Sequence, residues 1–268
     1  MIRSRRLASL LVCLPVLVGL APPSSGQLAS TAAQRLGAKI WVDRYQEIEE
    51  YLRTGECVSI EVLGPDRLRR CTLRPGGLAA RMAWISVAPG IYRGFWESYK
   101  ANIAAYEIDR LLKMDMVPPT VERQLQGNKG AATLWVENIV DLAKAASPDE
   151  ANRAGWEKQL VQMTMFDNLI GNPDRVPGNM LRDAAWNLIL IDHTRAFRPG
   201  RDLPHRLSRV DVGLWGKIQG LTRQQLDARL GPWLDGNEIA AILDRRERMK
   251  ADIDRLVAER GAAAVFLR

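Results

Sequence analysis

The spacing of apolar residues predicts strands and helices in the first half of the chain and mainly helices in the second. An amphipathic helix is expected where four apolar side chains recur at helical spacing opposite acidic residues: Trp41, Tyr45, Ile48 and Leu52. Two β-type runs at 58–62 and 68–73 flank a Gly-Pro-Asp turn and predict a hairpin.

The remaining elements follow from the same periodicities. Further strands are expected at 82–87, 117–121 and 132–136, with a helix over 98–113. After a polar stretch at 147–150, helices are expected near 156–170, 211–218, 222–230 and 236–259. This order favours an α+β fold of two lobes, a β-rich lobe over residues 27–137 and a helical lobe over 138–268.

The first 26 residues form a separate segment. Three arginines precede an apolar run from residue 7 to residue 20, and prolines and small residues follow it. This order is typical of a secretory signal peptide cleaved near Gly26, and the run is short for a membrane span. We expect an exported protein, periplasmic or secreted, without a stable membrane span after cleavage of the leader; an uncleaved N-terminal anchor is the alternative.

Composition narrows the function classes. The 268 residues are 47% hydrophobic and 26% charged, as in ordinary globular proteins. The formal charge of +7 becomes +4 once the three leader arginines are removed, which gives no indication of nucleic-acid binding. Two histidines and three cysteines without C-x-x-C spacing exclude a multi-histidine zinc site. A hydrolase triad built on Asp192-His193 lacks a G-x-S-x-G nucleophile motif.

Two cysteines flank the predicted hairpin. If Gly64 centres the turn, Cys57 and Cys71 lie opposite each other on the two strands. An exported protein reaches an oxidising compartment, where such a pair can form a disulfide. Two free thiols are the alternative.

The segment from Asn172 to Phe197 carries the candidate chemistry. It reads N-P-D-R-V-P-G-N-M-L and, after a linker, N-L-I-L-I-D-H-T-R-A-F. Asp174 and Asn179 lie on a loop that Pro173, Pro177 and Gly178 keep from being helical, and Asp192 ends an apolar strand-like run. Phosphoryl transfer uses such a set: one carboxylate accepts the proton of the nucleophile, while an amide oxygen and a second carboxylate hold a divalent ion.

This arrangement resembles the catalytic loop and metal-binding aspartate of the atypical kinases, a group that includes phosphoinositide kinases, HipA-type kinases and secretory-pathway casein and xylose kinases. Uncharacterised exported bacterial proteins are similar. The resemblance implies a two-lobed protein-kinase-like fold, with Asp174 as the catalytic base and Asn179 and Asp192 as ligands of Mg²⁺ or Mn²⁺. It also implies ATP or another nucleotide as the cofactor and an unidentified hydroxyl acceptor. Val176 replaces the loop histidine of the family pattern.

Other segments extend the resemblance over roughly residues 57–200. The run at 103–112 and the V-P-P-T-V segment after it are similar to the regulatory helix and the next strand of the secretory-pathway kinases. Trp135, Val136 and Glu137 fall where the hinge would face adenine through its backbone groups. Trp84, on the preceding strand, is a further candidate for adenine contact.

Two departures concern the ion pair that positions the nucleotide phosphates in kinases. Ile85 occupies the place of the strand lysine, and Asn102 occupies the place of the glutamate on the regulatory helix. A cation from elsewhere could take over, the candidates being Arg81, Arg93 and Lys100. Lys100 precedes Asn102 by two helical positions, which turns it away from the site.

Two functions therefore remain open. In the first, the chain is a metal- and ATP-dependent phosphotransferase of reduced or unusual activity. In the second, it is a pseudokinase that binds a nucleotide or a protein without turnover.

Three further side chains carry expectations. Arg195 is expected either to pair with a loop carboxylate such as Asp167 or Asp174, or to project into solvent. His193 is expected to be a structural hydrogen-bonding residue. Arg245, with Arg246, Arg248 and Lys250, is expected on a solvated helix face.

Overall fold

The computed structural model describes residues 38–63, 67–142 and 147–268. The predicted leader and its cleavage point lie outside the described residues. Among the described helices none combines the length and the apolar character that crossing a membrane requires.

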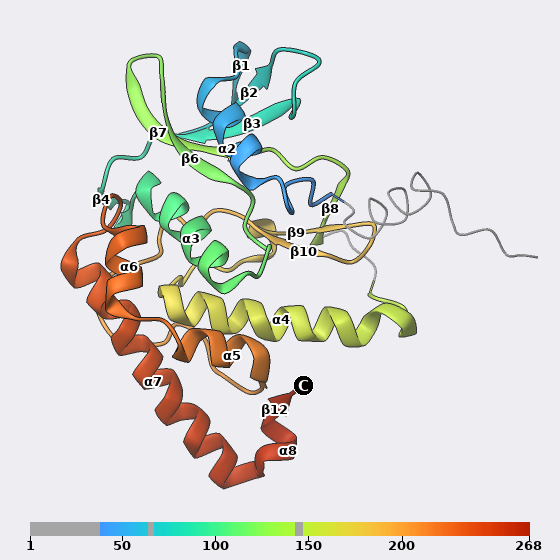
Figure 1. The fold of residues 1–268 in the computed structure, drawn as a ribbon, viewed down its shortest axis with the longest axis vertical. Coiled ribbons are helices and arrows are strands. Elements are labelled where there is room, and N and C mark those ends of the chain that lie inside the picture. Colours follow the sequence, from blue (N-terminus) through green and yellow to red (C-terminus); the bar gives the residue numbers. More distant parts are fainter. Residues whose placement is uncertain (1–37, 64–66, 143–146) are drawn as a thin grey trace, which may run out of the picture.

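A five-stranded sheet forms the first half of the chain (Figure 1). Its order is β1-β2-β3-β7-β6 and every neighbouring pair is antiparallel. The strands are β1 (Cys57–Leu63), β2 (Leu68–Leu73), β3 (Arg81–Ile85), β6 (Thr120–Leu125) and β7 (Asn128–Leu134). Helix α2 (Tyr45–Thr54) packs against β6 and β7, with Ile48 and Leu52 fully buried.

Short elements join this sheet to the second half. The hairpin of β4 (Gly90–Tyr92) and β5 (Phe95–Glu97) leads into helix α3 (Tyr99–Leu112), whose first turn is capped by the Ser98 hydroxyl. Strand β8 (Ile139–Asp141) pairs with β9 (Met180–Asp183), which pairs with β10 (Leu188–Leu190).

The second half is mainly helical and lies below the sheet in Figure 1. Its two longest helices are α4 (Glu150–Ile170) and α7 (Gly236–Arg260). The others are the 3-10 turn η2 (Pro177–Asn179), α5 (Val212–Gln219), α6 (Arg223–Leu230) and α8 (Ala262–Val265), with β11 (Val210–Asp211) pairing with β12 (Phe266–Leu267).

Two hydrophobic cores divide the molecule, and each takes in an element from the other half. Ala104, Ile108 and Leu112 of α3 are buried in the core of the helical half, although α3 precedes β6 and β7 of the sheet. Conversely, Ile189 of β10 is buried in the core between α2 and the sheet. The predicted α+β fold with a β-rich part followed by helices is confirmed.

Most predicted elements appear within a few residues of their expected bounds. Helix α4 begins earlier than expected, at Glu150, because Asp149 accepts the backbone N–H of Asn152 and caps it. The expectation for Arg245 was wrong: its side chain is 1% exposed and donates to the carbonyl oxygens of Leu169, Arg198 and Gly200.

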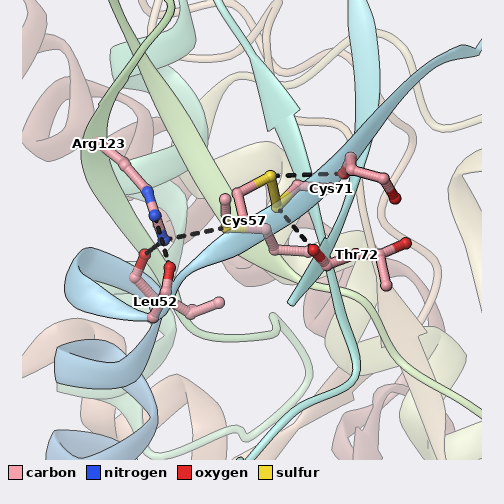
Figure 2. The surroundings of a disulfide bond; sticks show 8 residues. Leu52, Cys57, Cys71, Thr72 and Arg123 are labelled. Carbon is pink, nitrogen blue, oxygen red and sulfur yellow. Dashed lines mark hydrogen bonds between the residues drawn. A yellow bond between two sulfur atoms is a disulfide. The ribbon is translucent and has the colours of Figure 1, made fainter. Parts of the chain in front are cut away.

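A disulfide joins Cys57 and Cys71, with 5.7 Å between their Cα atoms (Figure 2). The predicted pairing is present, but the register behind it was wrong. Cys71 lies opposite Ile60, and Cys57 lies opposite Leu73, because the register shifts between Cys57 and Ser59. The bond therefore runs diagonally across the two strands.

Beside the disulfide, Arg123 of β6 donates hydrogen bonds to backbone carbonyl groups at the C-terminal end of helix α2. Its guanidinium donates to the carbonyl oxygens of Leu52, at 2.7 Å, and of Gly55, at 2.6 Å (Figure 2). These carbonyls have no partner within the helix, so the arginine acts as a C-terminal cap. The disulfide thus joins β1 to β2, and the cap joins the end of α2 to β6.

We expect the disulfide to stabilise the fold. Closing a loop of 14 residues lowers the entropy of the unfolded chain by an amount worth about 3 kcal/mol. The Cys57→Ala/Cys71→Ala variant should lose that much unfolding free energy in urea titrations followed by circular dichroism. Dithiothreitol should destabilise the wild type to a similar degree and leave the variant unchanged; equal responses of both proteins to dithiothreitol would contradict the prediction.

Candidate functional site

A mainly apolar cavity of about 320 Å³ lies between the sheet and the segment that carries Asp192. Its wall on the sheet side comes from β2, β3 and the end of β7, and its opposite wall comes from η2, β9 and the two residues that follow β10. The lining residues are Leu68, Ala83, Ile85, Asn102, Thr133, Leu134, Trp135, Val136, Ile139, Gly178, Asn179, Leu181, Ile191 and Asp192.

Strand β3 turns alternate side chains to opposite sides of the sheet. Ala83 and Ile85 line the cavity, whereas Met82 and Trp84 are fully buried in the core beneath α2. The indole N–H of Trp84 donates to the carbonyl of Arg123, at 3.2 Å. The structure thus contradicts the expectation that Trp84 faces a nucleotide, because a strand cannot direct residues 84 and 85 to the same side.

The segment after β7 supplies another wall of the cavity. Trp135 and Val136 line it. Glu137 does not line the cavity; it forms a two-pronged ion pair with Arg81. Arg81 is therefore engaged at the edge of the site by Glu137.

The loop after α4 fixes the position of Asp174. Gly171 ends the helix in the left-handed conformation, with φ of 64°. The side chain of Asn172 then bridges two acidic residues. Its amide N–H donates to the Asp167 carboxylate at 2.9 Å, and its Oδ1 accepts the backbone N–H of Asp174 at 3.2 Å. Asp174 is in this way attached to the end of α4 by a side chain as well as by the backbone.

Arg175 is the structural centre of this loop. Its guanidinium forms two hydrogen bonds with the carboxylate of Asp167, at 2.8 and 2.9 Å, and both side chains are buried. It also donates to the carbonyl oxygens of Asn179, at 2.7 Å, and Ile191, at 3.0 Å. One buried cation thus joins α4, the loop with Asn179 and the strand that leads to Asp192.

His193 completes this network. Its Nε2 lies 2.9 Å from a guanidinium nitrogen of Arg175 and accepts its hydrogen, because arginine can only donate. Burial and the nearby Arg175 charge lower the pKa of His193 well below its ordinary value. The imidazole is therefore neutral and has a structural role, as expected.

Asn179 and Asp192 line the same cavity and present oxygens suited to a divalent ion. The amide nitrogen of Asn179 donates to the carbonyl of Asp174, at 2.9 Å, which leaves its side-chain oxygen for another partner. Asp192 has a positive φ of 53°, and one of its oxygens accepts the Thr194 hydroxyl at 2.8 Å. The second carboxylate oxygen of Asp192 receives no hydrogen bond from the described residues. This donor set fits Mg²⁺ or Mn²⁺, which take few protein oxygens when phosphates and water complete the shell.

Asp174 lies beside these two residues without lining the cavity. Burial raises the pKa of its carboxyl, the Arg195 guanidinium opposes this rise, and the charges of Asp192 and Glu97 add to it. Arg195 approaches Asp174 to 3.2 Å, so of the two alternatives for Arg195 the pairing with a loop carboxylate is confirmed. Asp167, the other candidate partner, is taken by Arg175.

The two positions of the usual lysine–glutamate pair have other roles. Asn102 accepts the backbone N–H of His193, at 2.6 Å, and so attaches α3 to the residue after Asp192. Ile85 adds apolar surface to the cavity. Lys100 does not replace the lysine: it lines a different cavity with Trp96, Trp233 and Glu238.

The sequence did not single out Arg67 and Glu97, which belong to the chain of ion pairs that ends at Asp174. Glu97 joins Arg67, at 2.8 Å, to Arg195, at 3.1 Å. The short hairpin that holds Glu97 carries no strong period, and the partners are 30 and 98 residues apart. No signal in the sequence could have brought them together.

Removing Arg175 should unfold the site rather than merely weaken it. Arg175→Ala leaves the Asp167 carboxylate buried and unpaired, so we expect a loss of about 3–5 kcal/mol of unfolding free energy in urea titrations. Arg198→Ala, at an exposed position, should cost less than about 0.5 kcal/mol. A loss below 1 kcal/mol for Arg175→Ala would show that the buried pair is dispensable.

Comparisons with known proteins bear on the fold. No protein-family model matches the sequence, and no curated protein matches it. The solved structure of hydra Fam20 with sugar matches at 14% identity and a TM-score of 0.63, over 83% of this chain and 92% of that chain. A Golgi casein kinase matches at 16% identity and a TM-score of 0.64, over 84% and 78% of the two chains. The Golgi casein kinase with Mn/ADP bound matches at 14% identity and a TM-score of 0.63, over 96% of both chains.

At these identities the likeness concerns the fold alone. It agrees with the α+β fold described above. The chain therefore has the kinase-like α+β fold found in hydra Fam20 and the Golgi casein kinase.

Proposed function

We propose that this protein is an exported kinase-like phosphotransferase that binds ATP with Mg²⁺ or Mn²⁺ and transfers the terminal phosphoryl group to a hydroxyl acceptor. One observation carries the proposal: Asn179 and Asp192 line a single cavity with Trp135 and Val136. A base-sized apolar space is thus continuous with two metal-type ligands. The Mn/ADP complex of a protein with the same fold supports a nucleotide with a divalent ion.

Each residue has a defined part in this function. The apolar walls, with Trp135 and Val136, would bind the base, and Asn179 and Asp192 would hold the metal. A divalent ion bound there supplies positive charge that neutralises the phosphates. The acceptor oxygen forms a bond to the terminal phosphorus while the bond from that phosphorus to the departing diphosphate breaks. The acceptor's proton moves to the carboxylate of Asp174.

Export is proposed from two independent features. The arginine-rich, apolar first 26 residues have the pattern of a signal peptide. The Cys57–Cys71 disulfide is of the kind that persists in oxidising compartments such as a periplasm or the extracellular space.

A pseudokinase without turnover is the second candidate function. Ile85 and Asn102 replace both members of the ion pair that positions nucleotide phosphates. In addition, Arg195 forms an ion pair with the carboxylate of Asp174, the residue proposed as the base. Such a protein would bind a nucleotide, or a protein partner, and release no phosphate.

Variants of the two acids distinguish the two functions. Binding is measured as the shift of the melting temperature with ATP and Mn²⁺, and transfer as metal-dependent release of the terminal phosphate. Asp192→Asn should remove most of the metal-dependent shift. Asp174→Asn should keep the shift and slow transfer by about 10²- to 10⁴-fold.

Asp202→Asn is the matched control, because it removes an exposed carboxylate from the same half of the molecule. It should leave both measurements unchanged. Nucleotide binding without any transfer by the wild type would favour the pseudokinase. No binding of ATP with either metal would reject the phosphotransferase and leave only a pseudokinase that binds a protein partner.

The rate of transfer should depend on pH through Asp174. Only the ionised carboxylate accepts a proton, so activity falls as pH drops through its pKa, which burial raises above the ordinary value of 3.8. Arg195 opposes that rise, so Arg195→Ala should move the acid limb of the kcat/KM profile to higher pH. An acid limb that is unmoved, or moved to lower pH, would contradict the role of Asp174 as the base.

A further inference from the structure

The nucleotide cavity contains no cation. None of its lining side chains in the described part of the chain is a lysine or an arginine, and Ile85 stands where the strand lysine would be. A nucleotide triphosphate carries more negative charge than one divalent ion neutralises, and kinases add a protein cation for this reason. If the proposed function holds, positive charge has to reach the phosphates from outside the cavity lining.

Arg195 pairs with Asp174 and shares the carboxylate of Glu97 with a second arginine, Arg67. Arg67 lies 2.8 Å and Arg195 lies 3.1 Å from separate oxygens of Glu97. Arg195 also reaches Asp174, at 3.2 Å. The four side chains are between 14% and 29% exposed, so they form a partly buried ionic chain rather than a surface pair.

The hairpin of β4 and β5 fixes the orientation of both guanidinium groups. Arg67 lies over the ring of Tyr92, at 3.9 Å, and Arg195 lies over the ring of Phe95, at 4.1 Å. Tyr92 of β4 and Phe95 of β5 are directly opposite each other in the hairpin. Phe95 precedes Glu97 by two residues on β5. Stacking on an aromatic face leaves the edge of a guanidinium, where its N–H groups point, free to bind oxygen.

The position of Arg195 suits the transferred group. Asp174, as the base, has to lie beside the acceptor hydroxyl and hence beside the terminal phosphate. A guanidinium bonded to that carboxylate lies in the same place. Carboxylates and phosphates bind guanidinium groups with the same two-pronged geometry, so a phosphate can replace a carboxylate at these sites.

We propose that Arg195 and Arg67 bind the terminal phosphates of the nucleotide in place of the absent strand lysine, and that Glu97 competes with phosphate for both arginines. This inference rests on the proposed function, because it assigns further residues to the same nucleotide site. Transfer of Arg195 from Asp174 to the phosphate also frees the base to accept a proton.

Isothermal titration with ATP and with adenosine, both in the presence of Mn²⁺ at fixed ionic strength, tests the proposal. Adenosine lacks phosphates, so it reports on the apolar part of the cavity alone. Arg195→Ala and Arg67→Ala should each weaken ATP binding about tenfold. Both variants should bind adenosine as the wild type does. Arg195→Lys retains the positive charge but not the planar guanidinium that can form two parallel hydrogen bonds, so it should recover part of the lost affinity.

Glu97→Gln separates competition from a structural role. Removing the carboxylate leaves both arginines without their shared anion, so ATP should bind several-fold more tightly than to the wild type. Damage to the fold would weaken binding of ATP and adenosine alike. Arg198→Ala and Arg74→Ala, which remove exposed arginines from the same two segments, should change neither affinity.

The results separate this inference from the function on which it rests. A wild type that binds neither ATP nor adenosine would overturn the proposed function and this inference together. A wild type that binds ATP, with Arg195→Ala and Arg67→Ala binding it equally well, would overturn this inference alone. Weaker ATP binding by Glu97→Gln with unchanged adenosine binding would also overturn it, because the carboxylate would then be helping to hold the nucleotide.

Discussion

The buried ion pair of Asp167 and Arg175 fixes the side of the candidate site that carries Asn179 and Asp192. A charge out of contact with water is tolerated only when its hydrogen-bonding capacity is used, and Arg175 uses its own on five acceptor atoms of four residues. These acceptors belong to the end of α4, to the loop with Asn179 and to the segment with Asp192. The positions of the metal-type ligands are thus a consequence of satisfying one cation.

The two halves of the molecule are held together by exchanged elements. Helix α3 contacts β6 and β7 on the sheet side and α5 and α6 on the other, and its apolar face is buried in the helical core. Conversely, Ile189 of strand β10, in the second half, is buried in the core of the sheet. Because each half completes the core of the other, the cavity between them has walls that are fixed by packing.

Local sequence signals predicted the fold well, since hydrophobic periodicity and turn residues determine most elements directly. The motif at 172–179 and the run ending at Asp192 singled out Asp174, Asn179 and Asp192 by residue type and spacing, which are local signals. Their convergence depends on the buried Arg175, whose contacts no local pattern encodes. Alternation along a strand would have excluded Trp84 from the cavity once Ile85 was assigned to it.

Long-range pairing could not be predicted in the same way. The contacts of Glu97 with Arg67 and Arg195 join residues distant in the sequence, and no local pattern encodes them. Arg245 illustrates a different difficulty: it shares a helical face with the buried Ile242 and Met249, but an arginine is buried only if carbonyl groups from elsewhere meet it. Those carbonyls come from segments about 45 or more residues away.

The bond between Asn102 and the backbone of His193 has a consequence for the conditions in which the site keeps its shape. A lysine–glutamate bridge weakens in concentrated electrolyte and is lost when the acid takes up a proton. An amide oxygen that accepts a backbone N–H carries no net charge and does not titrate. Neither high salt concentration nor mildly acidic pH therefore weakens this hydrogen bond between α3 and His193. Such tolerance agrees with the proposed export, because a cell does not buffer the medium outside it.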